Sequence, residues 1–259
     1  MNPISSIENG FIRLAYLASG WKILERRGNI FVLEDRGSII MKCGYSTTYS
    51  ILNKKSIYTH SYFDYFIPLA YLHNRPRILV IGMGGGTIPL QMARLLGSDA
   101  SIEVVDVNGS IMELAKRHFL KGESIKTAIG DGVEYLSGKR REYDLIILDA
   151  FEGPRIPQQF LERRFAEIAG DALADDGILG INVDTMDGRV KSYMKIMQER
   201  FKVYSIRPSL TSTNLILICS KKLDNNQIAD AVNSRIKKTG ENEFLVRRYA
   251  GLHSNGKGY

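Results

Sequence analysis

From residue 77 onward, short apolar runs alternate with segments in which apolar residues recur every three or four positions. The apolar runs are rich in β-branched side chains and are typical of buried strands. We expect strands at 77–82, 101–107, 125–130, 143–150 and 177–183, and helices at 87–97, 109–120, 157–173 and 188–201. Such alternation predicts a parallel sheet with helices on both faces.

Two further apolar runs close this region, at 203–208 and 214–221. They are separated by SLTST, which is short enough for a hairpin. Parallel strands that end in an antiparallel hairpin form the sheet of class I methyltransferases. The pattern therefore predicts an α/β protein with a Rossmann-like, seven-stranded class I methyltransferase-type sheet.

The pattern before residue 77 is different. NIFVLED and SIIMKCG flank an Arg-Gly pair, which predicts a small N-terminal β-hairpin module. The tail contains one helical pattern, NNQIADAVNSRIKK. We therefore expect a β-rich module at 1–72, a Rossmann-like domain at 73–222 and a helical tail at 223–259.

Composition and charge narrow the classes of partner. The net charge is +7, but the basic residues are spread along the chain, so nucleic acid is not indicated as a partner. The cysteines Cys43 and Cys219 are far apart and the four histidines have no paired spacing, so no disulfide and no metal site is expected. No run approaches the ~18 apolar residues of a membrane span, and no signal peptide is recognisable. We expect a cytoplasmic protein that does not associate with a membrane.

The segment RILVIGMGGGTIPLQMARLL, residues 77–96, has four glycines directly after its apolar run: Gly82, Gly84, Gly85 and Gly86. A strand that ends in glycines and enters a helix brings backbone N–H groups and a helix N-terminus to one point, where a ligand can approach closely. A tight turn that binds nothing is the alternative. A dinucleotide is disfavoured because GMGGGT has no third glycine in the GxGxxG register.

Aspartates stand at the tips of the next three expected strands. Asp106 is placed to accept hydrogen bonds from both ribose hydroxyls, and Asp131, followed by Gly132, can accept one from an adenine amino group. Asp149 points into the crevice of an open α/β sheet, where it can take a proton from an attacking group. Each could instead be a helix cap or a buried salt-bridge partner. Their order suits an adenosyl sulfonium, either S-adenosylmethionine or its decarboxylated form, so residues 73–222 are expected to bind an adenosyl ligand.

These residues resemble the spermidine synthase family of aminopropyltransferases over roughly residues 62–183. The family's glycine loop is similar to GMGGG, its ribose acid to Asp106, its Gly-Asp pair to Gly130–Asp131 and its catalytic aspartate to Asp149. Its Tyr-His-Glu segment is similar to Tyr62–Asp64. The run LDAFEGPRIPQQFLERRF resembles a divergent spermidine synthase-like group.

Three positions depart from the family pattern. The acid that holds the amine of the donor in the family falls on Gly85. The second aspartate of the catalytic loop falls on Glu152, and the proline of that loop is displaced to Pro154.

The resemblance implies aminopropyl transfer from decarboxylated S-adenosylmethionine to a small amine, as in polyamine biosynthesis. Asp149 would be the catalytic residue, and Tyr62, Asp64 and Glu152 would bind the amine. Methyl transfer from S-adenosylmethionine is an alternative, because Gly85 removes a repulsion and the helix N-terminus could hold the methionine carboxylate. A non-catalytic adenosyl-binding protein is a second alternative. The resemblance also suggests a homodimer, and the acceptor is not identified by the sequence.

Overall fold

A mostly parallel sheet forms the centre of the computed structural model, which describes residues 3–45, 47–153 and 155–254. Its parallel strands are β5 (Arg77–Ile81), β6 (Ser101–Asp106), β7 (Lys126–Ile129), β8 (Tyr143–Leu148) and β9 (Leu173–Asp184). The antiparallel strands are β10 (Lys202–Ile206), β11 (Asn214–Ser220) and the two-residue β12 (His253–Ser254). The order across the sheet is β12-β10-β11-β9-β8-β5-β6-β7. The expected class I methyltransferase-type α/β fold is confirmed, with β12 added to the expected seven strands.

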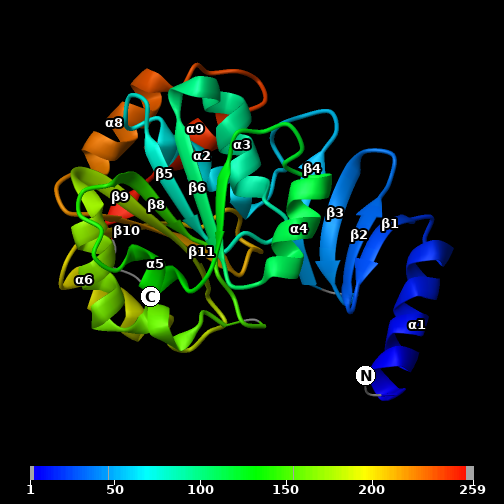
Figure 1. Cartoon of the computed structure of the whole chain (residues 1–259). Coiled ribbons are helices and arrows are strands. Elements are labelled where there is room, and N and C mark those ends of the chain that lie inside the picture. Colours follow the sequence, from blue (N-terminus) through cyan, green and yellow to red (C-terminus); the bar gives the residue numbers. More distant parts are fainter. Residues whose placement is uncertain (1–2, 46, 154, 255–259) are drawn as a thin grey trace.

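Helices cover both faces of this sheet (Figure 1). Alternate side chains of each buried strand point to opposite faces, as Ile78 and Val80 of β5 do relative to Leu79 and Ile81. The face of Ile78 packs against α2 (Ile67–Ala70), α3 (Thr87–Leu96), α4 (Gly109–His118), α8 (Asn225–Arg235) and α9 (Glu243–Ala250). The opposite face packs against α5 (Gly132–Leu136), α6 (Arg163–Ala172) and α7 (Val190–Gln198).

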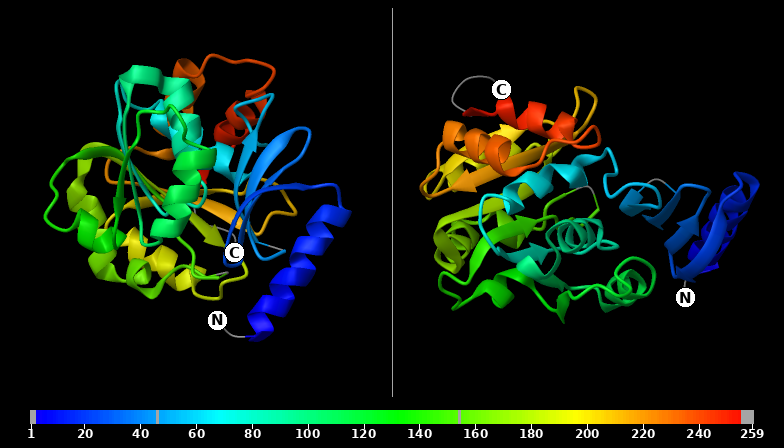
Figure 2. Two further views of the ribbon diagram at one scale, coloured as in Figure 1. Left: turned by 45° about the vertical axis from the view of Figure 1, so that its right-hand side comes forward. Right: turned by 90° about the horizontal axis from the view of Figure 1, so that it is seen from above.

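The N-terminal segment is larger than the expected hairpin. It forms an antiparallel four-stranded sheet of β1 (Lys22–Arg27), β2 (Ile30–Glu34), β3 (Ser38–Cys43) and β4 (Thr47–Asn53), beside the large sheet, with α1 (Pro3–Ala18) on its outer side (Figure 2). The expected hairpin is β2–β3 within this sheet. Phe31 and Leu33 of β2 pack with Tyr16 of α1, whereas Ile30 and Val32 belong to the main core. The small sheet thus joins the rest of the protein through one of its faces.

Several helical segments were not expected as separate elements, among them α1 and α2. The short η1 (Tyr62–Phe66) runs into α2 and packs against α3 and β11 of the large domain. In the tail, α9 follows the expected helix α8, and the Tyr249 hydroxyl of α9 donates to the Tyr65 carbonyl at 2.5 Å. Residues 255–259 of the expected tail lie outside the described residues. Among the residues that are described, no helix is both long and apolar enough to cross a membrane.

Candidate active site

The glycine loop and the three strand-tip aspartates lie together at the carboxyl ends of the parallel strands. The glycine loop follows β5, Asp106 ends β6, Asp131 follows β7 and Asp149 follows β8. The sheet order reverses direction at β5, because β6 lies on one side of it and β8 on the other. Open α/β sheets bind their ligands at such a switch point, outside the carboxyl ends of the strands.

The protein itself occupies the space beside each glycine of the loop. A Cβ on Gly82 would collide with the backbone of Asp149, and one on Gly86 would lie 2.9 Å from a methyl carbon of Leu120. A Cβ on Gly84 would lie 2.5 Å from the Tyr49 carbonyl oxygen. Gly82, Gly84 and Gly86 also have positive φ angles, which glycine adopts without strain. Close packing and backbone conformation therefore explain these glycines.

The backbone N–H groups of the loop are bonded within the protein. Met83 donates to Asp106 at 2.7 Å, Gly86 donates to the Met83 carbonyl at 2.8 Å, and Gly85 donates to the Ser50 hydroxyl at 2.6 Å. A ligand would therefore have to compete with these internal acceptors for the N–H groups, and ligand binding by the glycine loop stays a prediction.

Ser50 on β4 explains why an acid is absent at Gly85. A Cβ on Gly85 would lie 2.6 Å from the Ser50 Cβ, so a larger residue requires β4 to move. The Ser50 hydroxyl also accepts from the Thr87 N–H at 3.4 Å, at the start of α3. The small N-terminal sheet thus occupies the place where the resemblance puts the carboxylate that holds the amine of the donor.

Asp106 fixes the glycine loop to the end of β6. One carboxylate oxygen accepts from Met83 and the other from the Asn108 N–H at 2.7 Å. Burial raises the pKa of Asp106, while these backbone hydrogen bonds and one from Gly84 oppose the rise. A ribose at this strand tip would have to share the Asp106 oxygens with these backbone donors, and the ribose role of Asp106 stays a prediction.

Asp131 is the N-cap of α5. Its Oδ1 accepts from the N–H groups of Val133 and Glu134, at 2.8 and 3.0 Å, and its Oδ2 accepts from the Gln159 side chain at 3.1 Å. A Cβ on Gly132 would collide with a methyl group of Ile81, so this glycine is required by packing. Asp131 is therefore a helix cap through Oδ1, while Oδ2 takes no part in the cap and contacts Gln159.

Asp149 is the centre of a polar network. Its Oδ2 accepts from the Tyr62 hydroxyl at 3.2 Å, and its Oδ1 accepts from the Asn182 side-chain amide at 2.9 Å. The Asn182 amide oxygen in turn accepts from the Asn214 side chain at 3.0 Å. Tyr62 comes from η1, Asn182 from β9 and Asn214 from β11. Three segments that are far apart in the sequence thus orient one carboxylate.

The surroundings of Asp149 favour a carboxyl group that exchanges a proton near neutral pH. Burial raises the pKa of Asp149 to about 6, although the hydrogen bonds from Asn182 and Tyr62 oppose the rise. Burial and the adjacent Asp149 charge raise the pKa of Tyr62 well above its usual value, so its hydroxyl stays protonated and donates. A carboxylate with a raised pKa in a crevice is suited to general base catalysis.

Three polar residues on the strands beside Asp149 were not expected from the sequence pattern. Asn182 and Asn214 belong to buried strands, and Asp184 lies two residues after Asn182, on the same face of β9. Asp184 is paired across the sheet with Asn214 and accepts from the Met186 N–H at 2.8 Å. The available signal was the polar residue inside the apolar run GILGINVD, which is costly to bury unless it is hydrogen-bonded.

The expectation that Asp64 binds the substrate is wrong. Its side chain is 0% exposed, and its oxygens accept from the Thr59 N–H, the Thr59 hydroxyl, the His60 N–H and the Gln91 side chain. The distances are 2.6 to 3.0 Å. Asp64 therefore fixes the segment before η1 to α3 and has no oxygen left for an amine.

Glu152 lies on the surface loop that follows β8. Its side chain is exposed, and its backbone N–H donates to the Arg155 carbonyl at 2.8 Å. Pro154 of the same loop is outside the described residues. In the described ranges, no group of three or more His, Cys, Asp and Glu side chains could hold a metal ion.

The chain matches known proteins over its large domain. Residues 65–222, more than half of the chain, match the model of the spermine/spermidine synthase domain. A polyamine aminopropyltransferase of Vibrio vulnificus is 30% identical over 162 residues, which cover 58% of this chain and 52% of that protein. The match thus spans about half the length of that relative.

Two further matches show how widely the fold is used. The eEF1A lysine and N-terminal methyltransferase of Mus musculus is 26% identical over 155 residues, covering 55% of this chain and 22% of that protein. A spermidine synthase solved in complex with the transition-state analogue AdoDATO shares the fold, with a TM-score of 0.65 and 20% identity over 85% of this chain and 81% of that one. On the domain match over most of its large sheet, this chain belongs to the spermine/spermidine synthase family.

Proposed function

We propose that this protein is a transferase that moves an aminopropyl group from decarboxylated S-adenosylmethionine to a small amine, with Asp149 as general base. The observation that carries the proposal is the half-buried Asp149 carboxylate, held between Tyr62 and Asn182 beside the glycine loop. The name of the Vibrio relative, an aminopropyltransferase, supports the same reaction.

The adenosyl part of the donor would lie along the strand tips. Asp106 would accept bonds from the ribose hydroxyls, and Oδ2 of Asp131 would accept one from the adenine amino group, after Gln159 has moved aside. The adenosyl-type analogue bound to the solved spermidine synthase supports this choice of ligand.

The chemical step is a displacement at a carbon next to a sulfonium. The lone pair of the acceptor nitrogen forms the new C–N bond, and the C–S bond electrons return to sulfur, which leaves as the neutral thioether 5′-methylthioadenosine. Because an amine is mostly protonated at neutral pH, it must first lose a proton, and Asp149 accepts it. Tyr62 and Asn182 hold the carboxylate in place while it does so.

Asp184 is the second carboxylate that we assign to the acceptor. It shares the face of β9 that carries Asn182, and it is partly exposed. A diamine could present one nitrogen to Asp149 and its distal ammonium to Asp184. Glu152 lies further out on its surface loop and would add negative charge at the entrance.

Methyl transfer from intact S-adenosylmethionine is the second candidate, favoured by the absence of an acid at Gly85. The methyltransferase of Mus musculus supports it as well. However, the N–H groups of Gly85 and Thr87, which would hold the methionine carboxylate at the start of α3, already donate to Ser50. The donor's carboxylate would have to displace the Ser50 hydroxyl.

Calorimetric titration with both donors, followed by single-turnover assays with monoamines, diamines and methyl acceptors, separates the candidates. We expect tighter binding of the decarboxylated donor by at least tenfold, about 1.4 kcal/mol, and transfer to an amine. Tighter binding of S-adenosylmethionine with methyl transfer would establish the second candidate instead. Donor binding without transfer to any acceptor would indicate a binding protein.

Replacement of the acid at the tip of β6 tests the donor site. We expect Asp106→Ala to weaken binding of 5′-methylthioadenosine at least tenfold, because a charge-assisted hydrogen bond contributes about 1.5–3 kcal/mol. Loss of the bond to Met83 also loosens the glycine loop. Isothermal calorimetry measures the affinity, and circular dichroism shows whether the variant is folded. Unchanged affinity would show that Asp106 only supports the loop.

The pH dependence of the rate follows from the pKa of Asp149, which burial raises to about 6. A general base must be unprotonated, so kcat/KM should rise with pH, with its acid limb centred near pH 6, and level off above it. In Asn182→Ala the limb should move to higher pH, because one hydrogen bond that favours the charged carboxylate is lost. If the acid limb stays at the same pH in Asn182→Ala, the group that titrates is not Asp149.

A further inference from the structure

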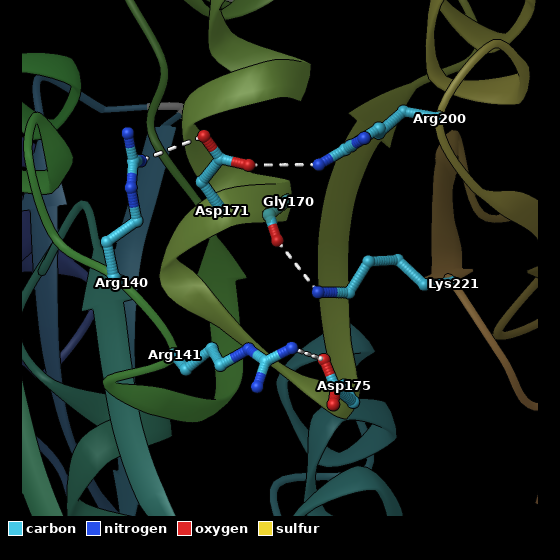
Figure 3. Close-up of a pocket in the computed structure, with 7 residues that line it drawn as sticks. All are labelled: Arg140, Arg141, Gly170, Asp171, Asp175, Arg200 and Lys221. Carbon is cyan, nitrogen blue, oxygen red and sulfur yellow. Dashed lines mark hydrogen bonds and ion pairs between the residues drawn. The ribbon is translucent and has the colours of Figure 1, made fainter.

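A cavity of about 470 Å³ lies at the amino ends of β8 and β9, at the opposite end of these strands from Asp149. It is bordered by the residues that precede β8, the end of α6 and the residue that follows β11. The six residues of β8 separate the cavity from Asp149, a distance of about 20 Å. The lining residues are Arg140, Arg141, Gly170, Asp171, Asp175, Arg200 and Lys221 (Figure 3).

The charges that line the cavity do not balance. Its cations are three arginines and one lysine, and they face two aspartates. Asp171 is shared by Arg140 and Arg200, at 2.8 and 2.9 Å, and Asp175 pairs with Arg141 at 2.8 Å. Each guanidinium has five N–H donors, so these contacts leave most of that capacity for a further acceptor.

Lys221 is held at the C-terminal end of α6. Its Nζ donates to the carbonyls of Gly170 and Leu173, at 2.9 and 3.0 Å. Burial lowers the pKa of Lys221, while the nearby charges act in both directions: Asp175 and Asp171 raise it, and Arg200 and Arg141 lower it. An anion in the cavity would add to the negative charges that favour the ammonium form.

The position of Arg200 depends on a glycine. A Cβ on Gly170 would lie 2.8 Å from the Nε of Arg200. The glycine therefore lets the arginine lie against the last turn of α6. Arg200 and Lys221 lie on one side of the cavity and Arg140 and Arg141 on the other, so the cations come from three separate segments (Figure 3).

We propose that this cavity binds a small phosphate-containing anion with at least two negative charges, such as a diphosphate group, free or as part of a nucleotide. Arginine forks suit phosphate oxygens, and the volume is that of a small-ligand site. The two aspartates would repel an extended polyanion, and no lining residue is aromatic to stack on a base. The phosphates would therefore supply most of the contacts.

Calorimetry on the full chain tests the proposal, with inorganic phosphate, inorganic pyrophosphate and ADP as probes. Excess 5′-methylthioadenosine in every titration keeps ADP out of the proposed donor site. We expect pyrophosphate to bind with 1:1 stoichiometry, more tightly than phosphate, and to weaken as NaCl is raised. Equal affinities for ADP and pyrophosphate indicate free diphosphate as the source, whereas ADP binding at least tenfold tighter indicates a nucleotide.

Two variants and a matched control identify the residues. Arg141→Gln and Lys221→Met should each weaken pyrophosphate at least tenfold, whereas Arg163→Gln, which removes another exposed arginine paired with an acid, should not. Lys221→Met loses the hydrogen bonds to the end of α6 and could unfold. Arg141 is exposed, so Arg141→Gln should remain folded and tests the site by itself. The proposal is overturned if pyrophosphate does not bind at millimolar concentration, or if Arg141→Gln binds it like wild type.

Discussion

Asp149→Asn should reduce turnover by roughly 10²–10⁴-fold, the usual contribution of a positioned general base. Asparagine keeps the shape and can still accept a bond from Tyr62 or Asn182, but it carries no charge and takes up no proton at neutral pH. Binding of the donor should change little, because we assign it to the glycine loop, Asp106 and Asp131. Single-turnover transfer, run beside donor titration, measures the two effects separately.

The control for this variant is Asp99→Asn, which replaces an exposed aspartate whose partner is Arg75. It should transfer at the rate of the wild type. If Asp149→Asn also transferred at that rate, Asp149 would only orient the network of Tyr62 and Asn182, and the proposed mechanism would be wrong. A loss of donor affinity equal to the loss of rate would instead place Asp149 in the donor site.

Asp64→Ala should lower the free energy of unfolding by about 3 kcal/mol. The substitution removes a fully buried carboxylate and leaves donors from Thr59, His60 and Gln91 without their partner. For a chain of this length, that loss corresponds to a fall in Tm of roughly 6–12 °C. Thermal and urea unfolding followed by circular dichroism measure it.

Asp99→Ala serves as the surface control and should change the unfolding free energy by less than about 0.5 kcal/mol. The two roles considered for Asp64 make opposite predictions. If Asp64 stabilises the fold, Asp64→Ala lowers Tm and leaves KM for the acceptor unchanged in the folded variant. If Asp64 binds the substrate, Asp64→Ala raises KM and leaves Tm unchanged, and this result would show that Asp64 belongs to the acceptor site.

The N-terminal sheet has a role at the site that its own sequence does not indicate. Ser50 of β4 bonds the glycine loop at Gly85, and Thr87 of α3 exchanges hydrogen bonds with the backbone of Ile51. These contacts join β4 to the start of α3. A change on β4 should therefore alter the donor site even though it lies in another sheet.

Local pattern predicted every strand of the large sheet except the two-residue β12. The strands of residues 77–220 and the helices between them follow from periodicity, because buried parallel strands are apolar on both faces and crossover helices have one apolar side. The strand tips follow too, since parallel strands place their carboxyl ends at one edge, and this located Asp106, Asp131 and Asp149. The strands β1 and β4 were missed because charged and polar residues such as Glu25 and Thr48 interrupt their patterns.

Periodicity and turn residues alone predicted most strands and helices of residues 77–220, the glycine loop and the acids at the strand tips. What each of these residues contacts became clear only from the folded chain. Ser50 fills the space beside Gly85, Asp64 is enclosed by its own segment and α3, and Asn182 and Asn214 meet Asp149 from two other strands. These contacts join positions far apart in the chain, and hydrophobic periodicity reports which side of an element is buried but not which polar partner lies opposite.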